Sequence, residues 1–168
     1  MVKTIIVDKL SKITKNRKRL EKKLNVKIVN RGREVKIEGM PEDEYIADKV
    51  IDALNFGFQY SDAIRIKEED FEFEQFSIKD YTHRRNLAGV RARVIGTKGK
   101  TLNTLGDLTG CVVELRDNEV GIIGPVESIK NAQDAVISII QGAKQSHAYK
   151  FLEKNRPTPI GDLGLREK

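Results

Sequence analysis

The sequence predicts an α+β fold made of two tandem copies of one unit, each a three-stranded sheet packed by helices. The main observation is an internal repeat, because segment 34–39 matches segment 119–124 at an offset of 85 residues. In both copies a strand, a turn, a second strand and a long helix follow one another. Two units of roughly 80 residues fit this chain, because each can bury its own modest core.

The elements of the second copy can be placed in order along the chain. Residues 71–78 alternate aromatic or apolar side chains with mostly acidic ones, which predicts a strand. Two short helices follow, and Gly110 ends the second of them. Residues 111–115 and 119–124 predict two further strands joined by a polar turn. A long helical pattern then covers residues 126–143.

The most informative segment is Gly96-Thr97-Lys98-Gly99, a Gly-x-x-Gly turn between the two short helices. Two glycines three residues apart let the backbone approach another backbone closely, because neither has a Cβ atom. KH domains use such a turn to clamp about four nucleotides of a single-stranded backbone. The element order is that of type I KH domains, β-α-α-β-β-α, and it predicts a KH domain over residues 71–156.

The first copy, residues 1–70, is predicted to be a degenerate type I KH-like domain. At the offset of 85, residues 11–14 fall where the Gly-x-x-Gly turn would lie, and they contain no glycine. Only Asp8 and Lys9 separate the predicted strand at 4–7 from the next helical residues, so the first helix must be very short. We expect this copy to keep the fold without the clamping turn.

The charge distribution favours a polyanionic partner. The chain has 31 Lys and Arg against 25 Asp and Glu, a formal net charge of +6. Residues 9–36 and 79–100 are mainly basic, whereas residues 37–75 are mainly acidic, which predicts separate basic and acidic faces. The basic run 15–23 has two open interpretations, the solvated face of an amphipathic helix or an accessory phosphate contact.

Enzymatic signatures are missing from the sequence. Residues 99–101 resemble the end of a phosphate-binding P-loop, but Val94 stands where that motif requires glycine. His83 and His147 have no Cys or carboxylate cluster around them that resembles a metal site. We therefore predict no catalytic residue, no metal, no cofactor and no small-molecule substrate.

The remaining features concern the single cysteine, the cellular location and the C-terminal tail. Cys111 is the only cysteine and lies in an apolar strand, so we expect it in the core, and no disulfide can form within the chain. No apolar stretch approaches membrane-spanning length and no signal peptide is visible, which predicts a cytoplasmic protein without a membrane partner. Residues 157–168 are predicted to form a flexible C-terminal tail.

Several segments of the second copy resemble a known family of ribosome-assembly proteins. These are residues 78–81 (IKDY), 84–87 (RRNL), 91–101 (RARVIGTKGKT) and 148–154 (AYKFLEK). They are similar to the second KH domain of the family that in eukaryotes is called the partner of Nob one. The chain resembles the short archaeal form with two KH domains, in which the first is likewise KH-like and lacks the Gly-x-x-Gly turn.

The resemblance implies a non-catalytic factor for maturation of the small ribosomal subunit. It implies binding of single-stranded rRNA near the 3′ end of the small-subunit RNA. The implied protein partners are the endonuclease Nob one and the alpha subunit of translation initiation factor two. Two alternatives stay open, namely a KH regulator or decay-associated RNA binder, and an adapter that acts mainly through protein contacts of the first copy.

The predicted RNA-binding residues belong to the turn, to the basic segment before it and to an apolar groove beside it. The turn lysines and the arginines supply positive charge for phosphate, and arginine can also stack on a base. The apolar side chains would frame a groove for a few unstacked bases, and we expect about half of them to be core residues only. These residues are Gly96, Thr97, Lys98, Gly99 and Lys100, then Arg84, Arg85, Arg91 and Arg93, then Val94, Ile95, Leu102 and Val113.

Overall fold

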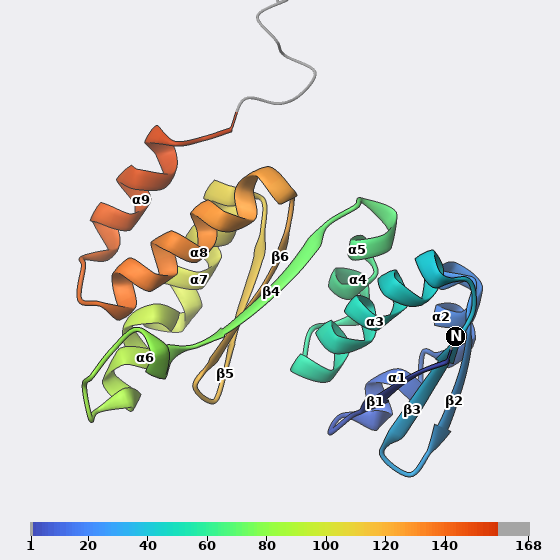
Figure 1. Ribbon diagram of the computed structural model, residues 1–168. Helices are drawn as coiled ribbons and strands as arrows, with labels where there is room; N and C mark the ends of the chain where they lie inside the picture. Colours follow the sequence, from blue (N-terminus) through green and yellow to red (C-terminus); the bar gives the residue numbers. More distant parts are fainter. Residues whose placement is uncertain (1, 158–168) are drawn as a thin grey trace, which may run out of the picture.

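The computed structural model describes residues 2–157. The predicted tail, residues 157–168, lies outside the described residues except for Pro157. Figure 1 shows the first half of the chain (blue to cyan) beside the second half (green to red), with α4 and α5 between them. No helix within residues 2–157 is long and apolar enough to cross a membrane.

Among the described residues of the first half, 2–70, there are three strands and five helices. The predicted short first helix is α1, which has five residues. The elements of this half are β1 (Val2–Ile6), α1 (Leu10–Thr14), α2 (Arg17–Leu24), β2 (Lys27–Arg31), β3 (Glu34–Glu38), α3 (Pro41–Phe56), α4 (Tyr60–Ala63) and α5 (Arg65–Glu68).

The second half has the same β-α-α-β-β-α order, and one helix follows its long helix where two short helices follow that of the first half. Its elements are β4 (Glu72–Ser77), the 3-10 helix η1 (Ile78–Asp80), α6 (Leu87–Ile95), the 3-10 turn η2 (Thr97–Gly99), α7 (Lys100–Thr109), β5 (Val112–Arg116), β6 (Glu119–Gly124), α8 (Val126–Ile140) and α9 (Gln145–Lys154).

Both sheets are antiparallel and have the same topology, which confirms the predicted fold class. Their strand orders are β1-β3-β2 and β4-β6-β5. Ile28 lies opposite Ile37 in the first sheet, and Val113 lies opposite Ile122 in the second. These two pairs differ by the same 85 residues, so the repeat preserves strand register as well as element order.

The end of the long helix differs from the sequence prediction. The periodic pattern extends to Ala143, but α8 ends at Ile140 and a separate helix, α9, begins at Gln145. The backbone of Gly142 has a φ of 112°, a conformation that glycine adopts easily and that interrupts an α-helix. Ala143, the last residue of the apolar pattern, is half-buried in the connection between the two helices, and α9 packs on the core separately, through Ala148 and Leu152.

The outer face of the second sheet is buried against the first half. Phe56, the last residue of α3, and Phe58, just after the helix, pack on Phe73 of β4, with ring centroids 6.1 and 5.8 Å from that of Phe73. A Cβ atom on Gly121 of β6 would lie 2.8 Å from the Phe56 ring, so this glycine allows the close approach. Ile123 of β6 belongs to the apolar core of the first half. The two halves therefore share a packed interface.

Candidate nucleic-acid interface

The Gly-x-x-Gly turn needs both of its glycines, for different reasons. Gly96 has φ 76° and ψ 172°, and a Cβ atom there would lie 2.2 Å from Thr101 Oγ1 and 2.7 Å from the Thr101 amide nitrogen. Gly99 has φ 76° and ψ 12°, but a Cβ atom there would meet nothing closer than the Asn103 side chain at 3.9 Å. The first glycine is required by the fold, and the second leaves open space beside the turn.

The exposed side of the turn is suited to an anion. Thr97, Lys98 and Lys100 are all exposed, and Lys98 adopts a left-handed conformation with φ 55° and ψ 31°. Helix α7 begins at Lys100 and has no acidic residue in its first turn. The N-terminal amide groups of a ten-residue helix therefore add their partial positive charge to that of two lysines.

Two separate hollows lie between helices α6 and α7 on one side and strand β5 on the other, and we refer to them together as the groove. One hollow, of about 390 Å³, is lined by α6, β5 and the β5–β6 turn. A larger hollow, of about 700 Å³, is lined mainly by α7 and β5. Because β5 is an edge strand, it presents backbone N–H and C=O groups that the sheet does not use.

The structure separates the predicted apolar residues into two groups. Val94 and Val113 are 0% and 8% exposed and belong to the second core. Val94 supports the groove from behind, whereas Val113 also lines the larger hollow. Ile95 and Leu102 are half-buried, and each lines one of the two hollows.

The predicted arginines are also separated. Arg91 lines the smaller hollow and donates a hydrogen bond of 2.6 Å to Asn118 Oδ1, which joins α6 to the β5–β6 turn. Arg93 instead donates to the Ala143 carbonyl at 2.7 Å, on the side of α9. Side chains two residues apart on an α-helix point in nearly opposite directions, which explains why Arg91 and Arg93 reach different sides. Arg84 and Arg85 are exposed in the loop before α6.

Helix α9 supports the start of the turn and was not expected to do so. Gln145 Nε2 donates a hydrogen bond of 3.3 Å to the Arg93 carbonyl, near the end of α6. Gln145 and Tyr149 also line a hollow with Gly96, Thr97 and Thr101, on the α9 side of the turn. No local sequence signal indicates this contact, because it joins residues about 50 positions apart.

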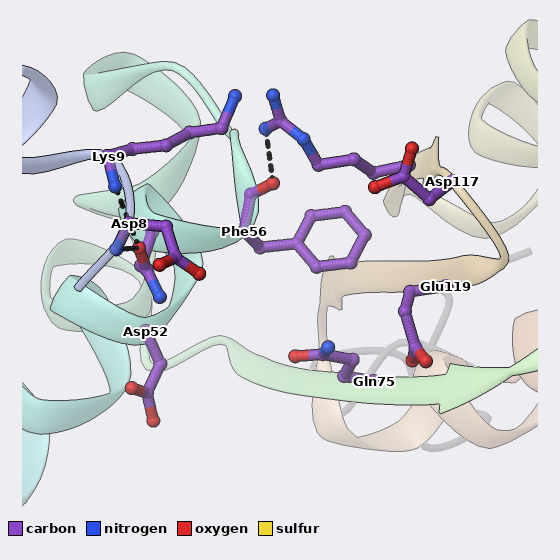
Figure 2. Close-up of a pocket in the computed structure, with 9 residues that line it drawn as sticks. Asp8, Lys9, Asp52, Phe56, Gln75, Asp117 and Glu119 are labelled. Atoms are coloured by element: carbon purple, nitrogen blue, oxygen red, sulfur yellow. Dashed lines mark hydrogen bonds between the residues drawn. The ribbon is translucent and has the colours of Figure 1, made fainter. Parts of the chain in front are cut away.

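A polar pocket of about 470 Å³ lies between the two halves (Figure 2). Figure 2 shows Asp52 of α3 on one side and Gln75 and Glu119 of the second sheet on the other. Partial desolvation raises the pKa of Asp52 to about 6, and the nearby Asp48 carboxylate contributes to the shift. Within residues 2–157, no group of three or more His, Cys, Asp or Glu side chains could hold a metal ion.

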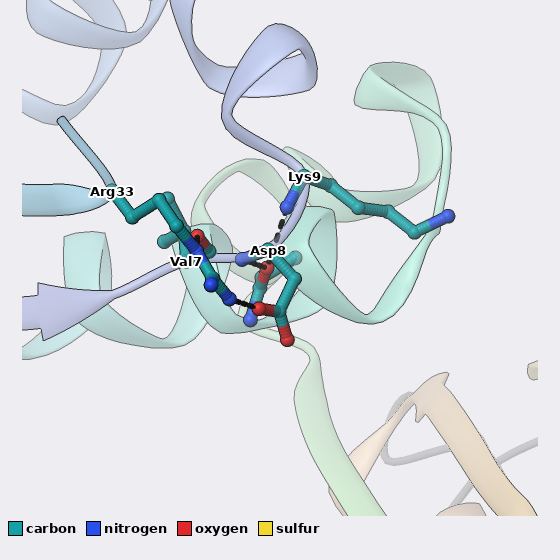
Figure 3. A network of polar contacts seen from close by, with 5 residues as sticks. Val7, Asp8, Lys9 and Arg33 are labelled. Atoms are coloured by element: carbon teal, nitrogen blue, oxygen red, sulfur yellow. Dashed lines mark hydrogen bonds and ion pairs between the residues drawn. The ribbon is translucent and has the colours of Figure 1, made fainter.

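The first copy has a polar network at the connection between β1 and α1, just before residues 11–14 (Figure 3). The backbone N–H groups of Asp8 and Lys9 donate to Asn55 Oδ1 at 2.7 and 3.1 Å, and Asp8 forms an ion pair with Arg33. These contacts fix the short connection between β1 and α1. Residues 11–14 continue as helix α1, so this copy has no Gly-x-x-Gly turn.

The second half therefore has the element order, the sheet topology and the Gly-x-x-Gly turn of a type I KH domain, and the first half has the same topology without the turn. The family model for the second KH domain of PNO1, described as a eukaryotic type KH-domain (KH-domain type I), matches residues 72–157. The chain belongs to this family of RNA-binding KH proteins.

Two curated relatives carry related names. The KH domain-containing protein MJ0443 of Methanocaldococcus jannaschii is 31% identical over 147 residues, which cover 83% of this chain and 65% of that protein. The pre-rRNA-processing protein PNO1 of Eremothecium gossypii is 31% identical over 102 residues, covering 59% of this chain and 38% of that protein. The chain thus spans less than two thirds of the length of these relatives.

Solved structures confirm the fold over nearly the whole chain. Dim2p from Pyrococcus horikoshii superposes with a TM-score of 0.84 at 24% identity, covering 92% of this chain and 99% of that one. A complex from the same organism, described as a/eIF2alpha-aDim2p-rRNA, contains a chain that matches with a TM-score of 0.83 at 24% identity, covering 92% of this chain and 93% of that one.

Proposed function

We propose that this protein binds single-stranded RNA through its second half, and that the target is the 3′ end region of small-subunit rRNA during ribosome maturation. The observation that carries the proposal is the turn at 96–99, which has open space at Gly99, exposed lysines and the start of α7 beside a groove. The rRNA target is supported by the names of relatives, a pre-rRNA-processing protein and a complex that contains rRNA.

In this proposal the turn holds phosphate and the groove holds bases. Thr97 and Lys98 approach the RNA backbone, which passes close to Gly99 because no Cβ atom lies in its way. Lys100 and the amide groups of α7 stabilise the negative charge. Arg91 contacts the strand at the α6 side of the groove, after releasing or sharing its bond to Asn118. Bases stack on Ile95 and Leu102 and pair with the free backbone edge of β5.

In this proposal the protein has a non-catalytic role and binds two protein partners. The alpha subunit of translation initiation factor two is supported by the composition of the Pyrococcus complex. The endonuclease Nob one rests on the family resemblance alone. The proposal places the protein in the cytoplasm and assigns residues 1–70 and 71–156 to the degenerate and the RNA-binding KH domain.

Fluorescence anisotropy with a short RNA that copies the 3′ end of small-subunit rRNA, and with a scrambled RNA, tests the proposal. The double variant Thr97→Asp, Lys98→Asp removes two contacts to phosphate. Because a hydrogen bond to a charged group contributes about 1.5–3 kcal/mol, affinity should fall at least about 100-fold. The variant Lys130→Asp, Gln133→Asp on α8 makes the same change in net charge away from the turn and should bind normally.

Each result has a distinct meaning. Preference of the wild type for the rRNA sequence, lost in the clamp variant and kept in the control, supports both the site and the target. Equal binding of the two RNAs would contradict the rRNA target. Unchanged affinity of the Thr97→Asp, Lys98→Asp variant would contradict the clamp.

A further inference from the structure

Arg65 reaches the groove of the second half from the first half. It is the first residue of the four-residue helix α5, and it lines the larger hollow together with Leu102 of α7 and Val113 of β5. The predicted RNA-binding residues all come from the second copy. Arg65 is therefore a groove residue that the repeat pattern could not indicate.

The guanidinium of Arg65 is held in place with one edge free. Its Nε atom pairs with the Glu69 carboxylate, and its Cζ atom lies 4.6 Å from the centroid of the Phe71 ring. Neither Nη group has a partner among the residues that the structure describes, and the side chain is 35% exposed. A fixed fork of unpaired donors suits bidentate recognition, because little entropy is lost when it binds.

The surroundings of Arg65 favour a base over a phosphate. Two other charged side chains line the same hollow, the carboxyl groups of Asp107 and Glu114. Partial burial and the nearby Asp62 carboxylate raise the pKa of Glu114 above its ordinary value, so both act against the ionised form of this side chain. A phosphate would add a further negative charge, whereas an uncharged base could lie on Leu102 and Val112 and accept hydrogen bonds from Arg65.

We propose that Arg65 is a base-reading residue of the groove, contributed by the first half, and that guanine is its best-matched base. Arginine binds the O6 and N7 atoms of guanine with two hydrogen bonds, and the flanking carboxylates can accept from its N1–H and N2–H groups. This inference rests on the proposed RNA-binding function. It gives the degenerate copy a direct part in recognition by the other copy.

The experiment uses a ten-nucleotide oligouridine with one guanosine moved through each position, measured by anisotropy with the full chain. The wild type should bind about tenfold more tightly when guanosine occupies one particular position. Replacing that guanosine by 7-deazaguanosine, which lacks N7, should remove most of the gain. The Arg65→Lys variant, which keeps the charge but loses the planar fork, should show no difference between the two nucleosides.

The controls separate recognition from folding. Lys67→Gln changes a neighbouring charge on α5 and should keep the guanosine preference. Arg65→Gln serves as a second variant if Arg65→Lys unfolds, and it should also lose the preference. Wild-type binding without any guanosine preference would overturn this inference alone. If Arg65→Gln weakened the binding of all RNAs equally, and reduced by about one the slope of log affinity against log salt concentration, Arg65 would contact a phosphate. That result would also overturn the inference. Failure of the wild type to bind any single-stranded RNA would overturn the proposed function itself.

Discussion

Replacing the two glycines of the clamp one at a time should separate folding from RNA binding. Gly96→Ala would place a Cβ atom 2.2 Å from Thr101 Oγ1 and 2.7 Å from the Thr101 amide nitrogen, so the turn or the start of α7 must move. The backbone conformation, with φ 76° and ψ 172°, is one that essentially only glycine adopts. That conformation costs about 1–3 kcal/mol for alanine, and the backbone clash brings the total to about 3 kcal/mol.

Gly99→Ala has a different expected effect. Its φ of 76° and ψ of 12° lie in the left-handed region, which costs alanine about 1 kcal/mol, and no atom lies closer than 3.9 Å to the new Cβ. At roughly 2–4 °C per kcal/mol for a chain of this size, the melting temperature should fall about 6–12 °C for Gly96→Ala and about 2–4 °C for Gly99→Ala.

Calorimetry and RNA anisotropy on both variants provide the assay. Gly99→Ala should weaken RNA binding at least about tenfold despite its small loss of stability, because its Cβ atom projects into the space proposed for the RNA backbone. Equal melting temperatures for Gly96→Ala and the wild type would refute the described turn geometry. Wild-type RNA affinity in Gly99→Ala would refute the close approach of the RNA backbone.

Three further predictions follow from the contacts of single residues. Arg93→Ala should lower the free energy of unfolding by about 1.5 kcal/mol, through the lost bond to the Ala143 carbonyl, and should change RNA affinity less than Arg91→Ala does; urea denaturation and anisotropy on both variants check this. Phe73→Ala should cost about 3 kcal/mol, because the side chain is half-buried, and both halves should still unfold in one transition, since its ring packs between them; two separate transitions would contradict the shared interface. Glu114→Gln should be more stable than the wild type at pH 7 and equal to it at low pH. Burial raises the folded-state pKa of Glu114, so its ionised form destabilises the fold, and the wild type regains this stability as the pH falls through that pKa; urea denaturation at several pH values measures the effect.

The sequence predicted those features that local patterns and the repeat determine. The offset between segments 34–39 and 119–124 predicted two sheets of the same topology, and the pairs Ile28–Ile37 and Val113–Ile122 confirm it. The Gly-x-x-Gly turn was visible because its geometry depends on four consecutive residues. The absence of that turn in the first copy was visible for the same reason.

The features that sequence did not predict depend on contacts between distant residues. Spacing alone could not assign Arg91 to the groove and Arg93 to the α9 side, because that requires knowing which helix face meets Ala143. Arg65 could not be placed in the groove, because its position depends on how the two halves pack. The end of α8 was misplaced, since Ala143 continues the apolar pattern although the backbone turns at Gly142.

The measurement that tests the central claim most directly is an NMR titration of the 15N-labelled protein with single-stranded RNA. The account predicts that amide shifts in the second half will be largest at Gly96–Asn103 and along β5, the turn and the edge of the groove. It also predicts that shifts of the exposed residues of α3, on the acidic part of the chain, will be negligible. Large shifts on α3 with an unchanged turn would contradict the account, because the RNA would then bind without the clamp.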